Sequence, residues 1–230
     1  MIGTRKLAVL SDPLAFLKAV PLGAALYFPM LQPSLTDYSG NGNHGTITGA
    51  TWSRRPSGVW ALSFDGNDHV VVANATSLQI TVWTMELWFN QSTIAAGTRM
   101  LLSKASQFYT LNSAAAMYSA QYGDATVDQI YSGSAITAST WYHRIITYDG
   151  GAAAADSFKS YRNGVLVAHS VASDTMETPV TNANDLYIGA ATGPADYFTG
   201  QIAMIVIYNR VLSAQEAAYR YHKTRPIIGA

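Results

Sequence analysis

The feature of this sequence that most constrains the fold is an apolar segment, residues 201–208, followed closely by a helix-start signal. The segment reads QIAMIVIY and is rich in Ile, Val and Tyr, a composition typical of a central strand covered on both faces. Ser213 and Glu216 have the spacing of a capping box, in which each side chain accepts a hydrogen bond from an otherwise unpartnered backbone amide. The sequence therefore predicts a buried strand and then a short helix that ends near His222, before Pro226.

Composition limits the classes of protein to which such a strand can belong. The chain has 230 residues and a net charge of zero; 12% of the residues are charged and 49% are hydrophobic. All-β sandwiches of this length often form one domain around one core. No basic excess points to a nucleic-acid partner, and no run reaches the ~18 to 20 apolar residues that membrane insertion requires. The sequence contains no cysteine, which excludes disulfides and thiolate metal sites.

Residues 1–23 are expected to form an arm, outside a main domain that covers residues 24–230. Asp12 and Pro13 form a favourable helix start, and Pro21 ends the short helix that would follow. The apolar side chains of this helix need a partner, which is either the arm's own domain or a neighbouring subunit in an assembly. These side chains are Leu14, Phe16, Leu17 and Val20.

Residues 83–89 alternate between two kinds of side chain, which is the pattern of a half-buried strand. The four odd-numbered residues are all large and apolar, so we expect them to face the core. The even-numbered residues Thr84, Glu86 and Trp88 then face away from the core.

Three glycines in the segment 37–45, which reads DYSGNGNHG, match a dinucleotide-binding motif by letter. Gly40, Gly42 and Gly45 have the spacing G-x-G-x-x-G, but such a site requires a helix that starts at the glycines. Here ITGATW follows, with β-branched residues and no helical period. We therefore interpret the segment as a surface loop in which glycine and asparagine supply left-handed backbone angles.

Turn and strand signals alternate through the rest of the chain. Asn163 and Gly164 form the strongest two-residue hairpin signal, and residues 65–68 predict a turn between two short strands. A dozen or so short strands with little helix predict an all-β fold. The expected architecture is a two-sheet antiparallel β-sandwich, or jelly roll, with one short C-terminal helix and the N-terminal arm. Further strands are expected at about residues 24–28, 60–72, 100–104, 108–112, 116–122, 141–148 and 185–189.

Several motifs occur in an order that indicates a family. They are DYSGNGNHG, LSFDGNDHVVV, MELWF, LLSK, WYHRIITYDG, YRNGVLV, LYIG and FTGQIAMIVIYNRVLSAQE. Over residues 24–222 the chain resembles the laminin-G-like jelly-roll family, part of the concanavalin A-like lectin and glucanase superfamily. The resemblance implies two antiparallel sheets packed face to face, one of them concave. It implies less about function, because this fold serves in sugar binding, protein contacts, enzyme accessory modules and virion surfaces.

The resemblance also raises the question of calcium, the one cofactor that the sequence suggests. Many relatives carry an acidic pair where this chain has Ala203 and Met204, and a carboxylate at the first position often joins a structural calcium site. The absence of that carboxylate weakens the prediction. The candidate calcium ligands are Asp37, Asp65 and Asp68, in oxygen-rich loops. The favoured alternative is that these aspartates stabilise turns.

Known catalytic signatures are missing from the sequence. Glucanases of this superfamily use carboxylates spaced E-x-D-x-x-E along one strand, so that nucleophile and acid flank the sugar. The three glutamates of this chain, Glu86, Glu177 and Glu216, have no aspartate at that spacing. No G-x-S-x-G, P-loop or H-E-x-x-H motif occurs either. We therefore expect a protein that is not an enzyme.

Aromatic side chains are the candidate binding residues, because lectin-like sites stack exposed rings on sugar faces. The chain has 5 Trp and 14 Tyr residues, most of which we expect to fill the core. Trp88 stands out because alternation places it opposite the core-facing side chains, although a second layer or another subunit would bury it. The candidate sugar-binding residues are Trp88, Tyr118, Tyr122 and Tyr131.

Low charge and an apolar arm suit a subunit that buries much of its surface against neighbours. The favoured hypothesis is a non-enzymatic structural or adhesive subunit that assembles with copies of itself or with other structural subunits. It would belong to a virion, as a phage decoration or tail protein, or to an extracellular surface. Arg5 and Lys6 precede an apolar run too short for a convincing signal peptide. The alternative hypothesis is a carbohydrate-binding module that recognises cell-surface or polymeric glycans.

Overall fold

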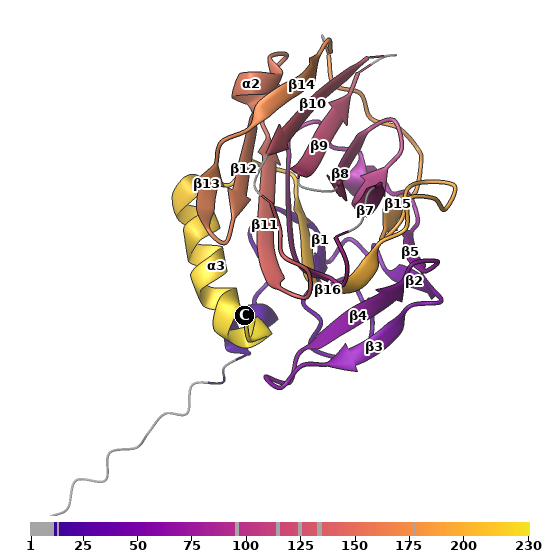
Figure 1. Cartoon of the computed structure of the whole chain (residues 1–230), viewed down its shortest axis with the longest axis vertical. Helices are drawn as coiled ribbons and strands as arrows, with labels where there is room; N and C mark the ends of the chain where they lie inside the picture. The colour runs from indigo at the N-terminus through magenta and orange to yellow at the C-terminus, as the bar shows by residue number, and fades with distance from the viewer. Residues whose placement is uncertain are drawn as a thin grey trace, which may run out of the picture.

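In the computed structural model the chain folds into two antiparallel β-sheets packed face to face, and a helix covers the outer side of one of them (Figure 1). The structure describes residue 12 and residues 14–94, 97–113, 116–123, 126–132, 135–176 and 178–230. The predicted all-β sandwich with a C-terminal helix is confirmed. The helical elements of the described chain are α1 (Ala15–Lys18), the 3-10 helix η1 (Thr76–Leu78), α2 (Ala154–Ser157) and α3 (Ala214–Ile228).

The first sheet, sheet A, is organised around the strand that the apolar segment predicts. This strand, β16, has one long neighbour on one side and shares its other side between two shorter strands. In spatial order the strands are β13 (Val165–Val167), β12 (Phe158–Arg162), β11 (Trp141–Tyr148), β6 (Trp83–Gln91), β16 (Thr199–Tyr208), β4 (Trp60–Asp65) and β3 (Thr51–Arg54), with β1 (Ala24–Phe28) paired to the second half of β16.

The second sheet, sheet B, packs against the inner face of sheet A and supplies the other half of the core. Its strands pair in antiparallel fashion from one edge to the other. In spatial order they are β14 (Ser170–Asp174), β10 (Val127–Ser132), β9 (Ala116–Tyr122), β8 (Phe108–Ser113), β7 (Thr98–Lys104), β15 (Leu186–Ile188), β5 (His69–Val72) and β2 (Gly45–Thr48).

Both turns predicted above form, but only one of them joins strands of the same sheet. Asn163 and Gly164 connect β12 to β13 with φ angles of 53° and 77°, the left-handed values that a two-residue hairpin turn requires. Residues 65–68 connect β4 of sheet A to β5 of sheet B. That turn is therefore a corner between the two layers.

The central strand β16 is buried on both faces, as predicted, and contains a β-bulge at Met204. Ala203 lies opposite Trp88 and Ile205 lies opposite Leu87, so Met204 is an extra residue on β16. Its φ angle is 44°, in a region that side-chain-bearing residues rarely adopt. Ala203 and Met204 both pack on the outer side of sheet A, whereas Ile205 packs between the sheets.

The pattern of β6 is only partly as predicted. Its odd-numbered residues from 83 to 89 face the space between the sheets, as expected. The even-numbered residues Thr84, Glu86 and Trp88 are fully buried as well. The prediction of a half-buried strand is wrong because α3 packs over the outer face of sheet A and forms a third layer there (Figure 1).

Helix α3 begins at the predicted capping box but is longer than predicted. Ser213 Oγ accepts a hydrogen bond from the Glu216 amide, and the Glu216 carboxylate accepts one from the Ser213 amide. The helix does not end near His222: it continues through Pro226 to Ile228.

Tertiary contacts explain why the helix passes its proline. Ile227 and Ile228 are buried, and Arg55 donates two hydrogen bonds to the Ile228 carbonyl at 3.0 and 3.1 Å. Gly229 closes the helix in the left-handed conformation, with a φ angle of 74°. These contacts offset the loss of the backbone hydrogen bond that Pro226, which has no N–H, cannot donate. No helix in the described ranges is long and apolar enough to cross a membrane.

A buried carboxylate holds α3 on sheet A. The two carboxylate oxygens of Glu86, on β6, share the single N–H of Arg220 Nε on α3, at 2.8 and 3.0 Å. Tyr208 Oη donates to the same carboxylate at 2.5 Å and His143 Nε2 at 2.9 Å. Burial raises the pKa of Glu86, but the Arg220 charge and these hydrogen bonds outweigh it and hold the pKa at about 2. The carboxylate is thus charged and fully paired, the condition under which burial of a charge is tolerated.

The described part of the arm packs on its own domain. Leu17 is 1% exposed, and its carbonyl accepts a hydrogen bond from Tyr27 Oη at 2.8 Å. Leu14 and Phe16 pack against the same apolar cluster, whereas Val20 is 49% exposed. The own-domain alternative is therefore confirmed for three of the four arm residues, and an assembly contact through the arm stays a prediction.

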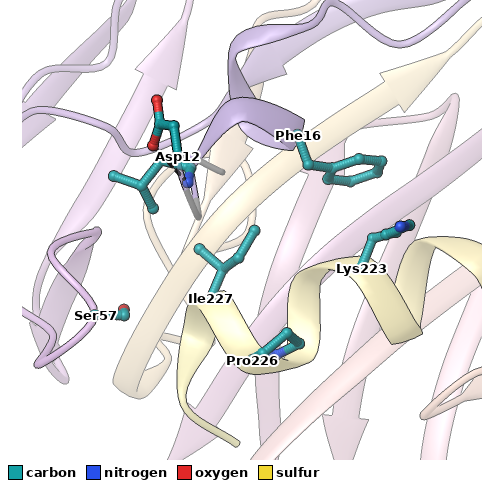
Figure 2. Close-up of a pocket in the computed structure, with 7 residues that line it drawn as sticks. Asp12, Phe16, Ser57, Lys223, Pro226 and Ile227 are labelled. Carbon is teal, nitrogen blue, oxygen red and sulfur yellow. Dashed lines mark hydrogen bonds between the residues drawn. The ribbon is translucent and has the colours of Figure 1, made fainter. Parts of the chain in front are cut away.

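A cavity of about 490 Å³ lies between α1 and the last turns of α3 (Figure 2). Phe16 extends from α1 above this space, and Ile227, Pro226 and Lys223 project toward it from α3. Its described lining combines four apolar residues with the polar side chains of Asp12, Ser57 and Lys223.

Replacing Glu86 with glutamine should destabilise the protein strongly. The substitution leaves the Arg220 guanidinium buried without a counter-charge, and breaking a buried pair in this way costs about 3 to 5 kcal/mol. Urea unfolding monitored by circular dichroism measures the loss. Glu216→Gln is the matched control, because its side chain is 42% exposed and its cap and ion pair are worth about 1 kcal/mol. Equal effects of the two substitutions would contradict the anchoring role of Glu86.

The stability of the protein should fall in acid. The folded-state pKa of Glu86 is about 2, against an ordinary value of 4.5. Its stabilising contribution is therefore complete above pH 4.5 and is lost as the pH falls toward 2. Urea unfolding at several pH values should show a loss on the order of 3 kcal/mol over this window. Glu86→Gln should lack this component; if it keeps the full acid dependence, other carboxylates carry the effect.

Candidate functional site

The outer face of sheet B carries paired tyrosines. Side chains alternate along β8, β9 and β10, so Tyr109, Tyr118, Tyr122 and Tyr131 lie on the face away from the core. Tyr118 and Tyr131 are direct cross-strand partners whose rings stack with 5.5 Å between centroids. Tyr109 and Tyr122 form a second pair with 5.9 Å between centroids. All four side chains are partly exposed, so the face presents aromatic surface to solvent.

A cavity of about 400 Å³ lies beside the Tyr109–Tyr122 pair. Met100 and Leu111 contribute apolar surface from β7 and β8, next to the two rings. The loop after β15 borders the cavity, and the Asp196 carbonyl holds this loop against β7 by accepting a hydrogen bond from the Met100 amide at 2.9 Å. The polar side chains of the described lining include Thr98, Ser103, Ser106, Thr192 and Asp196.

A buried lysine, Lys104, holds the neighbouring loops in place beside the cavity through hydrogen bonds. Lys104 Nζ, at the end of β7, donates to the Asn74 side-chain oxygen at 3.1 Å and to the carbonyls of Asn182 and Asn184 at 2.9 and 2.6 Å. The side-chain amides of Asn182 and Asn184 donate in turn to the Ala105 carbonyl. Burial lowers the pKa of Lys104 to about 8, so near neutral pH the ammonium is charged and holds these oxygens. Lys104 therefore supports the site rather than presenting a charge to a ligand.

The tyrosine hydroxyls of the cavity are neutral at physiological pH. Burial raises the pKa of Tyr109 to about 12 and also raises the pKa of Tyr122. The side-chain amide of Gln129 donates to the Tyr109 hydroxyl and orients it. Each hydroxyl can donate and accept hydrogen bonds, and Asp196 adds a carboxylate acceptor. The arrangement suits a ligand that has both hydroxyl groups and apolar C–H faces.

Three of the four predicted sugar-binding residues lie on this face, and one does not. Tyr118, Tyr122 and Tyr131 share the outer side of sheet B, although only Tyr122 lines the cavity. Trp88 is fully buried beneath α3, where its Nε1 donates to Thr224 Oγ1 at 2.9 Å. Alternation placed Trp88 on the correct side of β6, but the third layer removes it from solvent. The prediction of Trp88 as a sugar platform is therefore wrong.

Sequence reasoning identified Tyr122 but missed the rest of the cavity lining, including Tyr109 and Asp196. Tyr109 lies in a predicted strand directly after Phe108, which faces the core. Alternation along the strand therefore places Tyr109 on the outer face. Asp196 lies in the loop that follows β15, and no sequence pattern connects this loop to β8 or β9. Only the strand order of sheet B brings it beside the tyrosines.

The three aspartates proposed as calcium ligands stabilise turns. The Asp37 carboxylate accepts the backbone amides of Tyr27, Ser39 and Asn43, each at 2.9 Å. Within the 65–68 corner, Asp68 accepts the Asp65 amide at 2.8 Å. The described residues contain no group of three His, Asp or Glu side chains that could hold a metal ion. The Asp65 carboxylate accepts the Asn67 amide at 3.2 Å, so each of the three aspartates bonds a backbone amide of its loop, and calcium binding stays a prediction.

Receptor-binding domains of toxins share this fold. The binding domain of botulinum neurotoxin DC in complex with SialylT has a TM-score of 0.69 and 12% identity, over 89% of this chain and 52% of that chain. The binding domain of Paraclostridial Mosquitocidal Protein 1 has a TM-score of 0.67 and 14% identity, with the same coverage. The binding domain of botulinum neurotoxin DC in complex with rat synaptotagmin II has a TM-score of 0.69 and 13% identity, over 87% of this chain and 51% of that chain.

This chain thus spans about half the length of each of these domains, and at such identities the likeness is one of fold. A search of curated proteins gives no match. A family model matches residues 64–218, more than half of the chain, and describes the concanavalin A-like lectin/glucanases superfamily. The order of the motifs, the two-sheet architecture and this match agree. The chain belongs to the concanavalin A-like lectin/glucanases superfamily.

Proposed function

We propose that the protein is a non-catalytic adhesive protein that binds a carbohydrate on the outer face of sheet B. The observation that carries this proposal is the cavity beside the Tyr109–Tyr122 pair. Aromatic surface there meets hydroxyls and one carboxylate, and all of them are held by β-strands or by loops tied to strands. Sugars combine hydroxyl groups with apolar C–H faces, which such a lining recognises.

The charges around the cavity favour a neutral polyol over other ligand classes. The Lys104 ammonium is occupied by oxygens of the protein, so it offers little to a phosphate. The polar side chains of the lining disfavour a purely apolar ligand. Asp196 is the one carboxylate of the described lining, whereas glycoside hydrolysis requires a pair. Binding without hydrolysis is the activity that fits these residues.

The similar structures support adhesion as a general role. One is a toxin binding domain in complex with SialylT, and another is in complex with rat synaptotagmin II. Those ligands belong to those proteins. For this chain we infer only that a sandwich of this kind, with one outer face closed by a helix, serves as an extracellular or particle-surface adhesin through its other face.

Tyr122→Ala should weaken glycan binding at least tenfold, about 1.4 kcal/mol, because it removes one ring of the cavity. An array of neutral and sialylated glycans identifies the ligand, and isothermal titration with the best glycan measures the change. Tyr219→Ala is the matched control, since this exposed tyrosine lies on α3, beside sheet A. Equal losses in both variants, or no binding by the wild-type protein across the array, would overturn the proposal.

A second candidate function is assembly into a particle through the arm, and an exposed apolar patch favours it. Leu22 is 82% exposed, Val20 is 49% exposed and Val211 is 37% exposed. Arg210 Nε donates to the Leu22 carbonyl at 2.9 Å, so the arm and the segment before α3 are adjacent. We propose that this patch contacts another copy of the chain, as in a virion or another surface structure.

The assembly proposal predicts an oligomer that two exposed substitutions disrupt. Val20→Ser with Leu22→Ser should convert the oligomer to a monomer with an unchanged urea midpoint, as measured by light scattering coupled to size exclusion. Deleting residues 1–23 is a less clean test, because it removes the buried Leu17 and its bond to Tyr27. Ile94→Ser, at another exposed apolar residue, is the control. A monomeric wild-type protein would refute this role.

A further inference from the structure

An arginine lies in the interior between the two sheets. Arg144 is on β11, where its cross-strand partners are Leu87 of β6 and Arg162 of β12. Ile146, two residues further on the same face of β11, packs in the core between the sheets. The Arg144 side chain is therefore directed inward, and it is only 1% exposed.

Part of the Arg144 guanidinium has no hydrogen-bond partner among the described residues. Nη2 donates to the Tyr118 carbonyl at 3.1 Å and to Ser119 Oγ at 2.9 Å, both on β9. Nε and Nη1 are buried and unpartnered. A guanidinium carries five N–H donors, and buried donors are rarely left unpaired in folded proteins.

No described residue supplies a counter-charge to Arg144 within ion-pair distance. Its cross-strand neighbour Arg162 carries the same charge; it donates to the Ala135 carbonyl and lies over the Tyr142 ring. Burial lowers the pKa of Arg144 to about 9, so the side chain is still a cation near neutral pH. A buried cation faced by neutral groups and a like charge is unfavourable unless an anion joins it.

Two buried hydroxyl groups near Arg144 are unpartnered as well. Ser160 of β12 lies on the same face as Arg162 and two residues from it, which makes it a diagonal cross-strand neighbour of Arg144. Ser132 of β10 lies two residues from Ile130, the partner of Ser119. Each serine is 1% exposed, and each Oγ has no described partner. Buried hydroxyl donors from both sheets thus occupy inward-facing positions one or two residues in register from Arg144 or from its partner Ser119.

We propose that the space around Arg144 binds a small inorganic anion of the size of chloride. Such an ion neutralises the buried charge and accepts hydrogen bonds along one edge of the guanidinium, from Nε or from Nη1, with a serine hydroxyl as a further donor. Complete burial of these groups excludes a larger ligand. The same guanidinium binds the backbone of Tyr118 through Nη2, so the ion would lie next to the strand that carries the Tyr118–Tyr131 pair. It links sheet A to the strand that presents the tyrosines, and it is independent of the sugar proposal.

Crystals grown in sodium bromide test the site in the wild-type protein. Bromide replaces chloride and scatters anomalously, so a difference peak should appear beside Arg144 between the sheets. A peak confined to the protein surface, or ordinary water density at this position, would overturn the proposal. This experiment needs no variant and does not depend on whether substitutions at Arg144 fold.

Thermal unfolding in chloride and in gluconate at equal ionic strength gives a second test. Each tenfold rise in chloride above its dissociation constant should raise the Tm of the wild-type protein by about 3 to 5 °C. Arg54→Met, at an exposed arginine, should show the same rise, whereas Arg144→Met should show none. If Arg144→Met does not fold, Ser160→Ala should show a smaller rise than the wild type. Equal responses in the wild type and the interior variants, or no wild-type response, would refute the site.

Discussion

The ion pair between Glu86 and Arg220 is the interaction on which the layers of this protein depend. A lone buried carboxylate would be strongly unfavourable, so β6 tolerates Glu86 only while α3 supplies Arg220. This requirement fixes the helix over sheet A. The same helix buries Trp88, and the cluster beneath it receives Leu17 from the arm. With that outer face of sheet A closed, the outer face of sheet B presents its two tyrosine pairs to solvent.

Much of the fold could be predicted from the sequence, because alternation and capping are local properties. The central strand, the inward face of β6 and the start of α3 at Ser213 all follow from residues close together in the chain. The burial of Glu86 could not be predicted, since alternation shows which side chains share a face but not what covers that face. The same limit applies to Pro226, whose helix is held by Arg55, more than 150 residues away in sequence.

The candidate site could be predicted only in part, for a related reason. Tyr118, Tyr122 and Tyr131 lie on neighbouring strands, and their aromatic character singled them out. Alternation along β8 places Tyr109 on the outer face, whereas no local pattern marks Asp196, because its position depends on the strand order of sheet B. Arg144 lies in a predicted strand, but nothing local distinguishes an inward-facing arginine from an exposed one. Sites assembled from distant segments require the register of the sheet.

The bulge at Met204 divides β16 into two segments of opposite phase. Before it, Ala203 points outward and Ile202 inward; after it, Ile205 and Ile207 point inward. A strict two-residue period applied across the whole strand therefore assigns half of its residues to the wrong layer. In a relative that lacks this one residue, both segments of the strand could keep their pairing with β6. Only the sequence positions of the inward-facing residues would shift by one. An alignment gap at this point would thus record a change of bulge rather than an evolutionary loss of the strand.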